Sequence, residues 1–240
     1  MARLFTSDWH LNSSNIITYA KRPFKSSEKM AAAYIRSCNQ QAKSRYDQII
    51  HVGDFFLKGI DRHDSQAGAD SSLGFSAQHY LDQITASVLL LEGNHDSNNV
   101  GHTLAKQLIL DLGPFKCTSV SHYPSTDKGT WTLRGKDKEH LHIHLCGHVH
   151  EKWKWKLDFE KLVLNINVGV DQWKHQIVSE KKLIGYIMKL MASQEFKDTL
   201  YPEKAKLAKT LSGLHAPHLS TWDADPAEEV WRLGEPSGKW

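Results

Sequence analysis

Two short patterns of Asp and His contain the side chains with the clearest chemistry in the sequence. Asp8 and His10 are separated by one residue, and so are His148 and His150. Because side chains of an extended segment repeat with a period of two, we expect each pair to point to one side of the chain. Carboxylates and neutral imidazoles suit Mn, Fe, Co, Ni or Zn, so these residues indicate a metal site.

The same residue types recur at three further points: Asp54, the run Asn94 to Asp96 that includes His95, and His122. The candidate metal ligands are therefore Asp8, His10, Asp54, Asn94, His122, His148 and His150. Seven ligands are too many for one ion, but they suit two ions that share a carboxylate. Gly53 and Gly147 precede two of these ligands and remove side-chain bulk where the backbone must approach the ions.

The elements that must position these residues alternate between short apolar strands and amphipathic stretches, a pattern typical of a layered α/β domain. We expect strands at 3–6, 48–52, 88–91, 116–121, 140–145, 153–159 and 162–168. We expect helices at 27–45, 75–85 and 106–111, and a loop at 58–74. The first five strands each end beside an Asp, Asn or His. Because ligands of open α/β sheets bind beyond the carboxyl ends of the strands, we expect these side chains to converge.

Composition indicates an ordinary globular protein. The 240 residues are 40% hydrophobic and 24% charged, and the formal net charge of +3 is too small to indicate a DNA-binding surface. No apolar run approaches the roughly 20 residues that a membrane span needs. Polar residues interrupt the N-terminus where a signal peptide would be apolar, so we expect a cytoplasmic protein with no membrane partner. The odd number of cysteines, without close pairing, argues against disulfides and thiolate metal sites.

The composition changes near residue 191. Four of the seven prolines lie between Pro202 and Pro236, and the strand pattern ends before them. We therefore predict a main domain over residues 1–190 and a C-terminal extension over 191–240, with a short helix at 204–211 and a tail that contains tryptophans.

In order and approximate spacing, the motifs resemble those of the calcineurin-like metallophosphoesterase family. They are Asp8-x-His10, Gly53-Asp54, Gly93-Asn94-His95-Asp96, His122 and Gly147-His148-x-His150, within about residues 3–180. Five motifs in order are far more specific than any one alone. The segments TSDWHLNSSNII, SHYP and NVGVDQW further resemble the small bacterial and phage-encoded branch of that family.

The resemblance implies an α/β fold, a four-layer α/β/β/α sandwich of two mixed sheets flanked by helices, as the metallophosphoesterase domain. It also implies two divalent metal ions, with Mn favoured and Fe, Zn, Ni or Co as alternatives. The ligands implied for the first metal are Asp8, His10, Asp54 and His150, and those for the second are Asp54, Asn94, His122 and His148. Asp54 would then bridge the two ions.

The reaction implied is metal-dependent hydrolysis of a phosphate ester, in which a hydroxide held between the metals attacks phosphorus. His95 would protonate the leaving oxygen, and Asp96 would orient the imidazole.

The residues expected to contact substrate match the family pattern less well than the expected metal ligands do. Asn15 stands as in the relatives, but Asn12 and Ser13 replace a Gly-His pair that many of them have. Lys21 and Arg22 lie just beyond the first motif, where they form either a solvated turn or a phosphate contact.

Several functions stay open at this point. A phosphodiester or nucleotide-type substrate is favoured, with a 5'-nucleotidase-type phosphomonoesterase or a DNA/RNA nuclease as alternatives. A metal-binding interaction scaffold is the non-enzymatic alternative, and loss of Asp54 or His95 would have favoured it, but both are present. The expected partner is a small phosphate ester or nucleotide; nucleic acid and the oligomeric state stay open.

Overall fold

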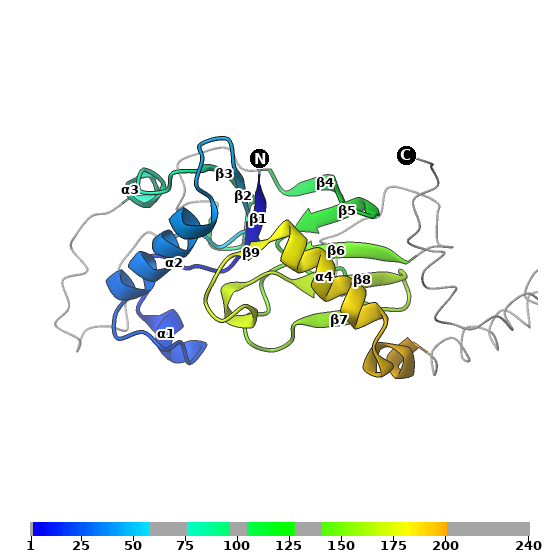
Figure 1. Cartoon of the computed structure of the whole chain (residues 1–240). Helices are drawn as coiled ribbons and strands as arrows, with labels where there is room; N and C mark the ends of the chain where they lie inside the picture. The colour runs from blue at the N-terminus through cyan, green and yellow to red at the C-terminus, as the bar shows by residue number, and fades with distance from the viewer. Residues whose placement is uncertain (1, 58–75, 97–104, 128–140, 201–240) are drawn as a thin grey trace, which may run out of the picture.

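The computed structural model describes residues 2–57, 76–96, 105–127 and 141–200. Its strands form two sheets (Figure 1). The first sheet contains β1 (Arg3–Thr6), β2 (Gln48–His51), β3 (Ser87–Leu90) and β9 (Val178–Ser179), in the order β3-β2-β1-β9. The second contains β4 (Gln107–Leu112), β5 (Phe115–Ser121), β6 (His142–Cys146), β7 (Trp155–Asp158) and β8 (Val163–Asn167), in the order β4-β5-β6-β8-β7.

Both sheets combine parallel and antiparallel pairs. In the first, β1 pairs with β2 and β2 with β3 in parallel, while β9 runs antiparallel to β1. In the second, β6 lies parallel to β5 and β8, while the outer strands β4 and β7 are antiparallel to their neighbours. The predicted α/β class with two mixed sheets and helices is confirmed.

The helices are α1 (Asn15–Tyr19), α2 (Ser27–Gln41), α3 (Ala77–Leu81), α4 (Glu180–Met191) and the 3₁₀ turn η1 (Val170–Gln172). The hydroxyl of Ser26 accepts the backbone N–H of Lys29 and caps α2. The helix then buries Met30, Tyr34 and Cys38, which recur every four residues on one face. In α4, the buried residues Leu183, Ile187 and Leu190 follow the same helical spacing.

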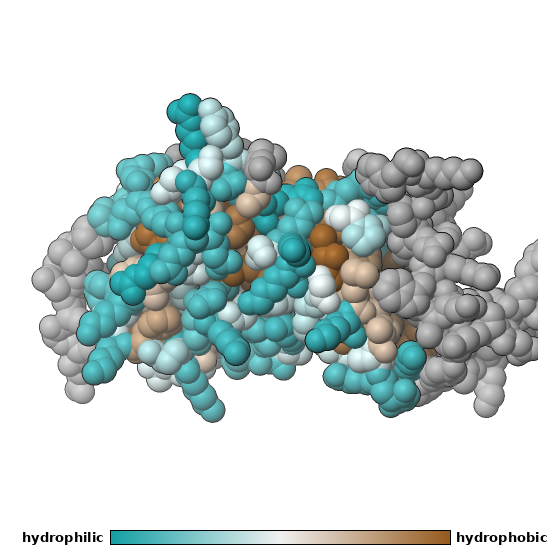
Figure 2. All heavy atoms as spheres, viewed as in Figure 1, coloured by the Kyte–Doolittle hydropathy of each residue, from teal (hydrophilic) through white to brown (hydrophobic). Residues whose placement is uncertain are grey.

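Two apolar clusters place the first sheet between helices and the second sheet. Alternate residues of β1 point to opposite faces: Leu4 packs with Met30 of α2, while Phe5 packs with Leu145 of β6 and with α4. Figure 1 accordingly shows α1 and α2 on one side of the first sheet and α4 crossing in front of the second. On the viewed face, mainly hydrophilic side chains cover these clusters (Figure 2).

The helix predicted at 106–111 is wrong, because the structure has strand β4 there. Leu108, Leu110 and Leu112 are less exposed than the residues between them, a period of two that fits a strand. Leu108 pairs with Val120 of β5 in an antiparallel hairpin that turns at Gly113, whose φ is +56°. Pairing with β5 outweighed the local helix propensity of this segment.

Other element boundaries also differ from the expectation. The helices predicted at 27–45 and 75–85 are shorter, at Ser27–Gln41 and Ala77–Leu81, while β9 and α4 were not predicted. The loop predicted at 58–74 and the helix at 204–211 lie outside the described residues.

The packed chain continues past α4. Phe196 and Leu200 are buried in the cluster that joins the two sheets. The division at residue 190 stays a prediction. In the part of the chain that the structure describes, no helix has the length and apolarity to cross a membrane.

Candidate metal centre

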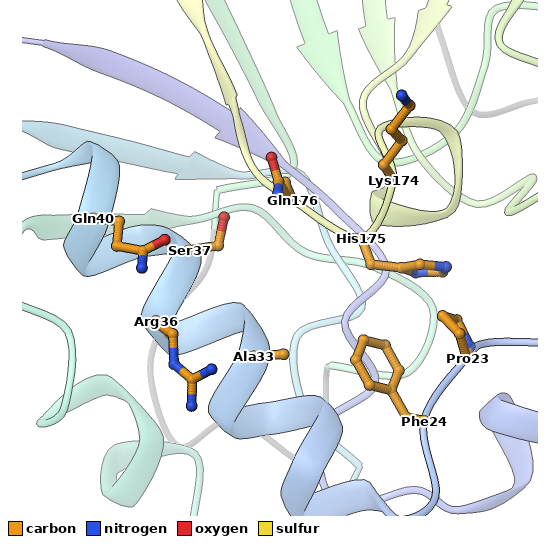
Figure 3. A pocket seen from close by; sticks show the side chains of 9 residues that line it. All are labelled: Pro23, Phe24, Ala33, Arg36, Ser37, Gln40, Lys174, His175 and Gln176. Atoms are coloured by element: carbon orange, nitrogen blue, oxygen red, sulfur yellow. The ribbon is translucent and has the colours of Figure 1, made fainter.

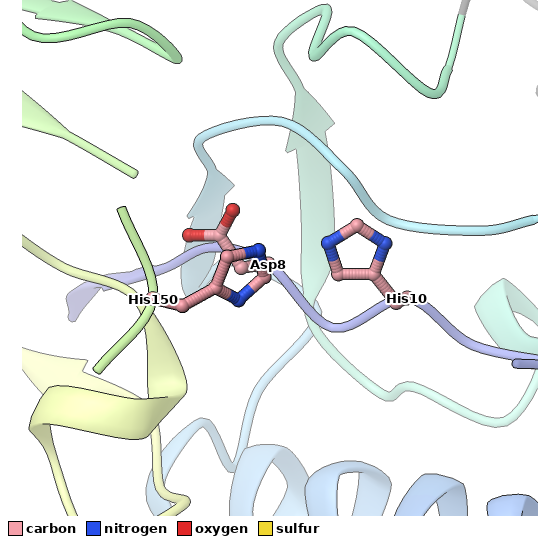
Figure 4. Close-up of side chains that lie close together, drawn as sticks. All are labelled: Asp8, His10 and His150. Carbon is pink, nitrogen blue, oxygen red and sulfur yellow. The ribbon is translucent and has the colours of Figure 1, made fainter. Parts of the chain in front are cut away.

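The segments that follow β1 and β6 bring together one group of predicted ligands. Ligand atoms of Asp8, His10 and His150 lie within 4.8 Å of one another (Figure 4). The Asp8 carboxylate also accepts a hydrogen bond from the backbone, because the N–H of His148 donates to Asp8 Oδ1 at 2.9 Å. All three side chains of the group are buried.

The remaining predicted ligands, Asp54, Asn94, His122 and His148, lie next to the first group, and Asp8 contacts both sets. Ligand atoms of Asp8, Asp54 and His122 also lie within 4.8 Å of one another. Asn94 Oδ1 lies 3.0 Å from His122 Nε2 and 3.0 Å from His148 Nδ1. The structure thus brings all seven predicted ligands together, at the ends of the five predicted strands.

Asp54 lies between the two groups. Its Oδ2 atom is 3.4 Å from His10 Nε2 and 3.3 Å from His122 Nε2. Burial by itself would raise the pKa of the Asp54 carboxyl, but the hydrogen bond and charge of His122, together with the charge of His10, hold that pKa well below its usual range. A buried carboxylate in this position suits a divalent cation.

The hydrogen bonding of His10 indicates whether the cluster fits a metal. Its Nε2 atom is buried and makes no hydrogen bond to any described residue. Burial lowers the pKa of His10 to about 3, so the ring is neutral and one of its nitrogens carries a lone pair. A buried polar atom without a partner costs about 1–3 kcal/mol. A divalent cation would satisfy this nitrogen together with the nearby carboxylates, so the residues fit such an ion.

The backbone fixes the orientation of the His122 ring. His122 Nδ1 donates to the carbonyl oxygen of Val52 at 2.9 Å, which directs Nε2 at Asp54. Burial lowers the pKa of His122, but the hydrogen bond to Asp54 and the charges of Asp8 and Asp54 raise it to about 9. A metal that binds here therefore has to displace a proton from His122.

The backbone, and not strand geometry, aims the ligands. Five of the seven predicted ligands have a positive φ, which L-residues adopt rarely: Asp8 (60°), His10 (49°), Asp54 (57°), His148 (70°) and His150 (47°). The expectation that Asp-x-His and His-x-His lie on extended segments is therefore wrong. Left-handed residues cost roughly 1–2 kcal/mol each, and their concentration here indicates a functional site.

Two glycines make room for this arrangement, as predicted. A Cβ atom on Gly53 would lie 2.5 Å from His122 Nδ1, and its φ of +86° also favours glycine. A Cβ atom on Gly147 would lie 2.6 Å from Asp8 Oδ2 and still closer to Ser7 Oγ.

Asp96 makes contacts that differ from the role expected for it. Its fully buried carboxylate accepts the backbone N–H groups of Asp54 (2.6 Å), Gly93 (2.8 Å) and Phe55 (2.9 Å). Burial raises the pKa of Asp96, and these three donors oppose the rise. These hydrogen bonds join the segment that follows β2 to the segment that follows β3.

His95 lies at the exposed edge of the cluster. Its backbone N–H donates to Asp54 Oδ1 at 2.9 Å, and its ring centroid is 5.2 Å from that of His10. Its ring also falls within 4.8 Å of ligand atoms of His10 and Asp54. His95 is therefore placed to meet either a ligand in solvent or a metal.

The predicted substrate contacts differ in their exposure. Asn15 is exposed at the first residue of α1, and Lys21 is exposed beyond it. Arg22 is buried and its guanidinium forms an ion pair with Asp171, so it does not lie in the solvated turn that was one of the two expectations for it. Asp171 was missed, because a single Asp after a buried strand has no pattern that separates a site residue from a turn residue.

A separate cavity of about 290 Å³ opens between α2 and the turn that leads to β9 (Figure 3). Its lining residues are Pro23, Phe24, Ala33, Arg36, Ser37, Gln40, Lys174, His175 and Gln176, and none of them is a predicted ligand.

Comparisons with known proteins found a matching family and a curated relative. A family model described as "Calcineurin-like phosphoesterase superfamily domain" matches residues 1–179. The uncharacterized protein MJ1445 of Methanocaldococcus jannaschii is 28% identical over 90 residues, which are 38% of this chain and 44% of that protein. The chain thus spans less than half the length of this curated relative.

Among solved structures, the protein of unknown function AQ665 from Aquifex aeolicus aligns with a TM-score of 0.51 and 21% identity, over 77% of this chain and 98% of that one. The phosphoesterase Yfce from E. coli aligns with a TM-score of 0.39 and 14% identity, over 70% of this chain and 79% of that one. The AQ665 likeness supports the fold.

The motif-based prediction of the family is confirmed by the family match, which covers well over half of the chain. The protein belongs to the calcineurin-like phosphoesterase superfamily.

Proposed function

We propose that the protein is a dinuclear metal-dependent phosphoesterase. The position of Asp54 carries this proposal, because one carboxylate oxygen lies 3.4 Å from a histidine of the first ligand group and 3.3 Å from a histidine of the second. A carboxylate so placed suits a bridge between two ions.

The donor set favours ions of the manganese type. It consists of carboxylates, imidazoles and one amide oxygen, with Mn proposed first and Fe, Zn, Ni or Co as alternatives. Asp8, His10, Asp54 and His150 would hold one ion, and Asp54, Asn94, His122 and His148 the other. When bound, such a pair of ions would supply a water-derived nucleophile at neutral pH and neutralise charge on the phosphoryl oxygens.

His95 would donate a proton to the leaving oxygen of the substrate. Its exposure and its position beside Asp54 and His10 support this role, since a general acid must reach both the centre and the substrate. The rival role is a metal ligand, and the metal content of a His95 variant separates the two.

The proposed substrate is a phosphodiester or nucleotide-type ester. A diester carries one negative charge, which two ions and His95 can stabilise. A monoester dianion usually calls for added Arg or Lys donors, and Arg22 is already bound to Asp171. Because the Asp171 ion pair occupies Arg22, a diester substrate is favoured over the monoester of the nucleotidase alternative.

Hydrolysis of bis-nitrophenyl phosphate tests the proposal. Protein stripped with a chelator should be inactive, and Mn should restore turnover to the wild type but not to Asp54→Asn. Asp158→Asn is a matched control, because Asp158 is also buried but binds Ser125 and Lys161 instead of a ligand. Full activity of the chelated protein or of Asp54→Asn would overturn the proposal. Metal binding without hydrolysis of any ester would favour the scaffold alternative.

A further inference from the structure

We propose that Arg22 and Asp171 form a clamp that positions one of the two metal sites, the one built on Asp8, His10 and His150. The proposal rests on the dinuclear function above and adds two positioning residues to it. The pair is hereafter the Arg22–Asp171 clamp.

The Arg22 guanidinium uses all five of its N–H donors inside the protein. Nε donates to Asp171 Oδ1 at 2.8 Å, and Nη2 donates to Asp171 Oδ2 at 2.8 Å. Nη2 also donates to the carbonyl of Asp8 at 2.6 Å, while Nη1 donates to the carbonyl of Trp9 at 3.0 Å and to Met30 Sδ at 3.5 Å. The fork therefore fixes Asp171 and the backbone of the first motif together.

Asp171, held by Arg22, in turn contacts the imidazole of His150. Asp171 Oδ2 lies 3.2 Å from His150 Nδ1, and a carboxylate can only accept, so Nδ1 is the donor and Nε2 is the ring nitrogen left for a metal. A carboxylate behind an imidazole orients the ring and raises its basicity toward a metal.

The clamp also explains how the strained first motif is held. Asp8 has a φ of 60°, and its carbonyl accepts the shortest of the five Arg22 bonds. One cation thus joins the backbone of one ligand, Asp8, to the side chain that holds another, His150. These two lie side by side in Figure 4 although they are far apart in the sequence.

The ligands proposed for the other ion, namely Asp54, Asn94, His122 and His148, have different supports. His122 is oriented by the carbonyl of Val52, and Asn94 lies between the rings of His122 and His148. A role confined to the fold would weaken both metal sites together or neither. The clamp predicts that only one of them weakens.

Calorimetric titration of metal-free protein with Mn²⁺ tests the clamp. For the wild type we expect two bound ions. For Asp171→Asn we expect one ion to bind about 10–100-fold more weakly, the usual effect of losing such a support, while the other binds as before. Arg22→Lys keeps the charge but not the fork, so it should weaken the same ion to a smaller extent. Asp158→Asn is the control, and we expect it to change thermal stability but neither affinity.

The outcomes separate the clamp from the dinuclear function. A wild type that binds fewer than two ions would overturn both. A wild type that binds two, with Asp171→Asn unchanged or equally weakened at both sites, would overturn the clamp alone. Should Asp171→Asn fail to fold, Arg22→Lys decides, and unchanged affinities in that variant would overturn the clamp. An equal loss of affinity in Asp158→Asn would do the same.

Discussion

Replacing Asp96 by Asn isolates the role of a buried carboxylate that binds three backbone N–H groups. Oδ2 accepts the N–H of Asp54 and Gly93, and Oδ1 accepts that of Phe55. The Asn amide can keep its oxygen toward the first two donors, but its NH₂ group then faces the Phe55 N–H. One charged hydrogen bond is lost, two become neutral, and a buried donor stays unsatisfied.

The expected loss of unfolding free energy is about 2.5–6 kcal/mol, since a hydrogen bond to a charged group contributes about 1.5–3 kcal/mol and an unsatisfied buried donor costs about 1–3 kcal/mol. Urea denaturation of the chelated protein measures it without a contribution from bound metal. Because Asp96 ties together the segments that present Asp54 and Asn94, metal affinity should fall as well.

Asp47→Asn is the matched control. Asp47 also accepts three backbone N–H groups, from Ala2, Lys43 and Ser44, but it is only partly buried. Water can replace its bonds, so its loss of stability should be smaller. A loss in Asp96→Asn below about 1 kcal/mol, or equal to that of Asp47→Asn, would refute the reasoning. Unchanged stability with lower turnover would instead support the role in orienting His95.

Three further predictions concern the site. His95→Asn should lower turnover by about 10²–10⁴ with metal content unchanged, and less for esters with good leaving groups; an equal loss for good and poor leaving groups would contradict the general-acid role. Gly147→Ala should weaken metal binding, because its Cβ would displace Asp8, whereas Gly185→Ala in α4 meets no atom within 4 Å and should stabilise the protein by about 0.5–1 kcal/mol in thermal unfolding. Bis-nitrophenyl phosphate should have a kcat/KM at least equal to that of the monoester, and a tenfold monoester preference would favour a nucleotidase.

The residues that cluster at this site were predictable from the sequence because metal chemistry restricts residue type. Asp, Asn and His at the ends of five apolar segments have few other uses in combination, and the structure brings all seven predicted ligands together. Their backbone conformation was not predictable. Nothing in the letters of Asp-x-His distinguishes an extended pair from two left-handed residues, such as Asp8 and His10.

Residues that act through long-range contacts were the hardest to assign. Arg22 follows the first motif, where a solvated turn or a phosphate contact was expected, but its partner Asp171 lies 149 residues away in the sequence. The β4 strand shows the same difficulty for the fold. Its alternation of Leu108, Leu110 and Leu112 was present in the sequence, but only pairing with β5 shows that it outweighs helix propensity.

The number of metal ions bound per chain tests the dinuclear proposal most directly. Wild-type protein loaded with Mn and freed of excess metal should hold two ions by elemental analysis, and Asp54→Asn should lose metal because both proposed sites would share that carboxylate. One ion or none in the wild type, or full occupancy in Asp54→Asn, would contradict it.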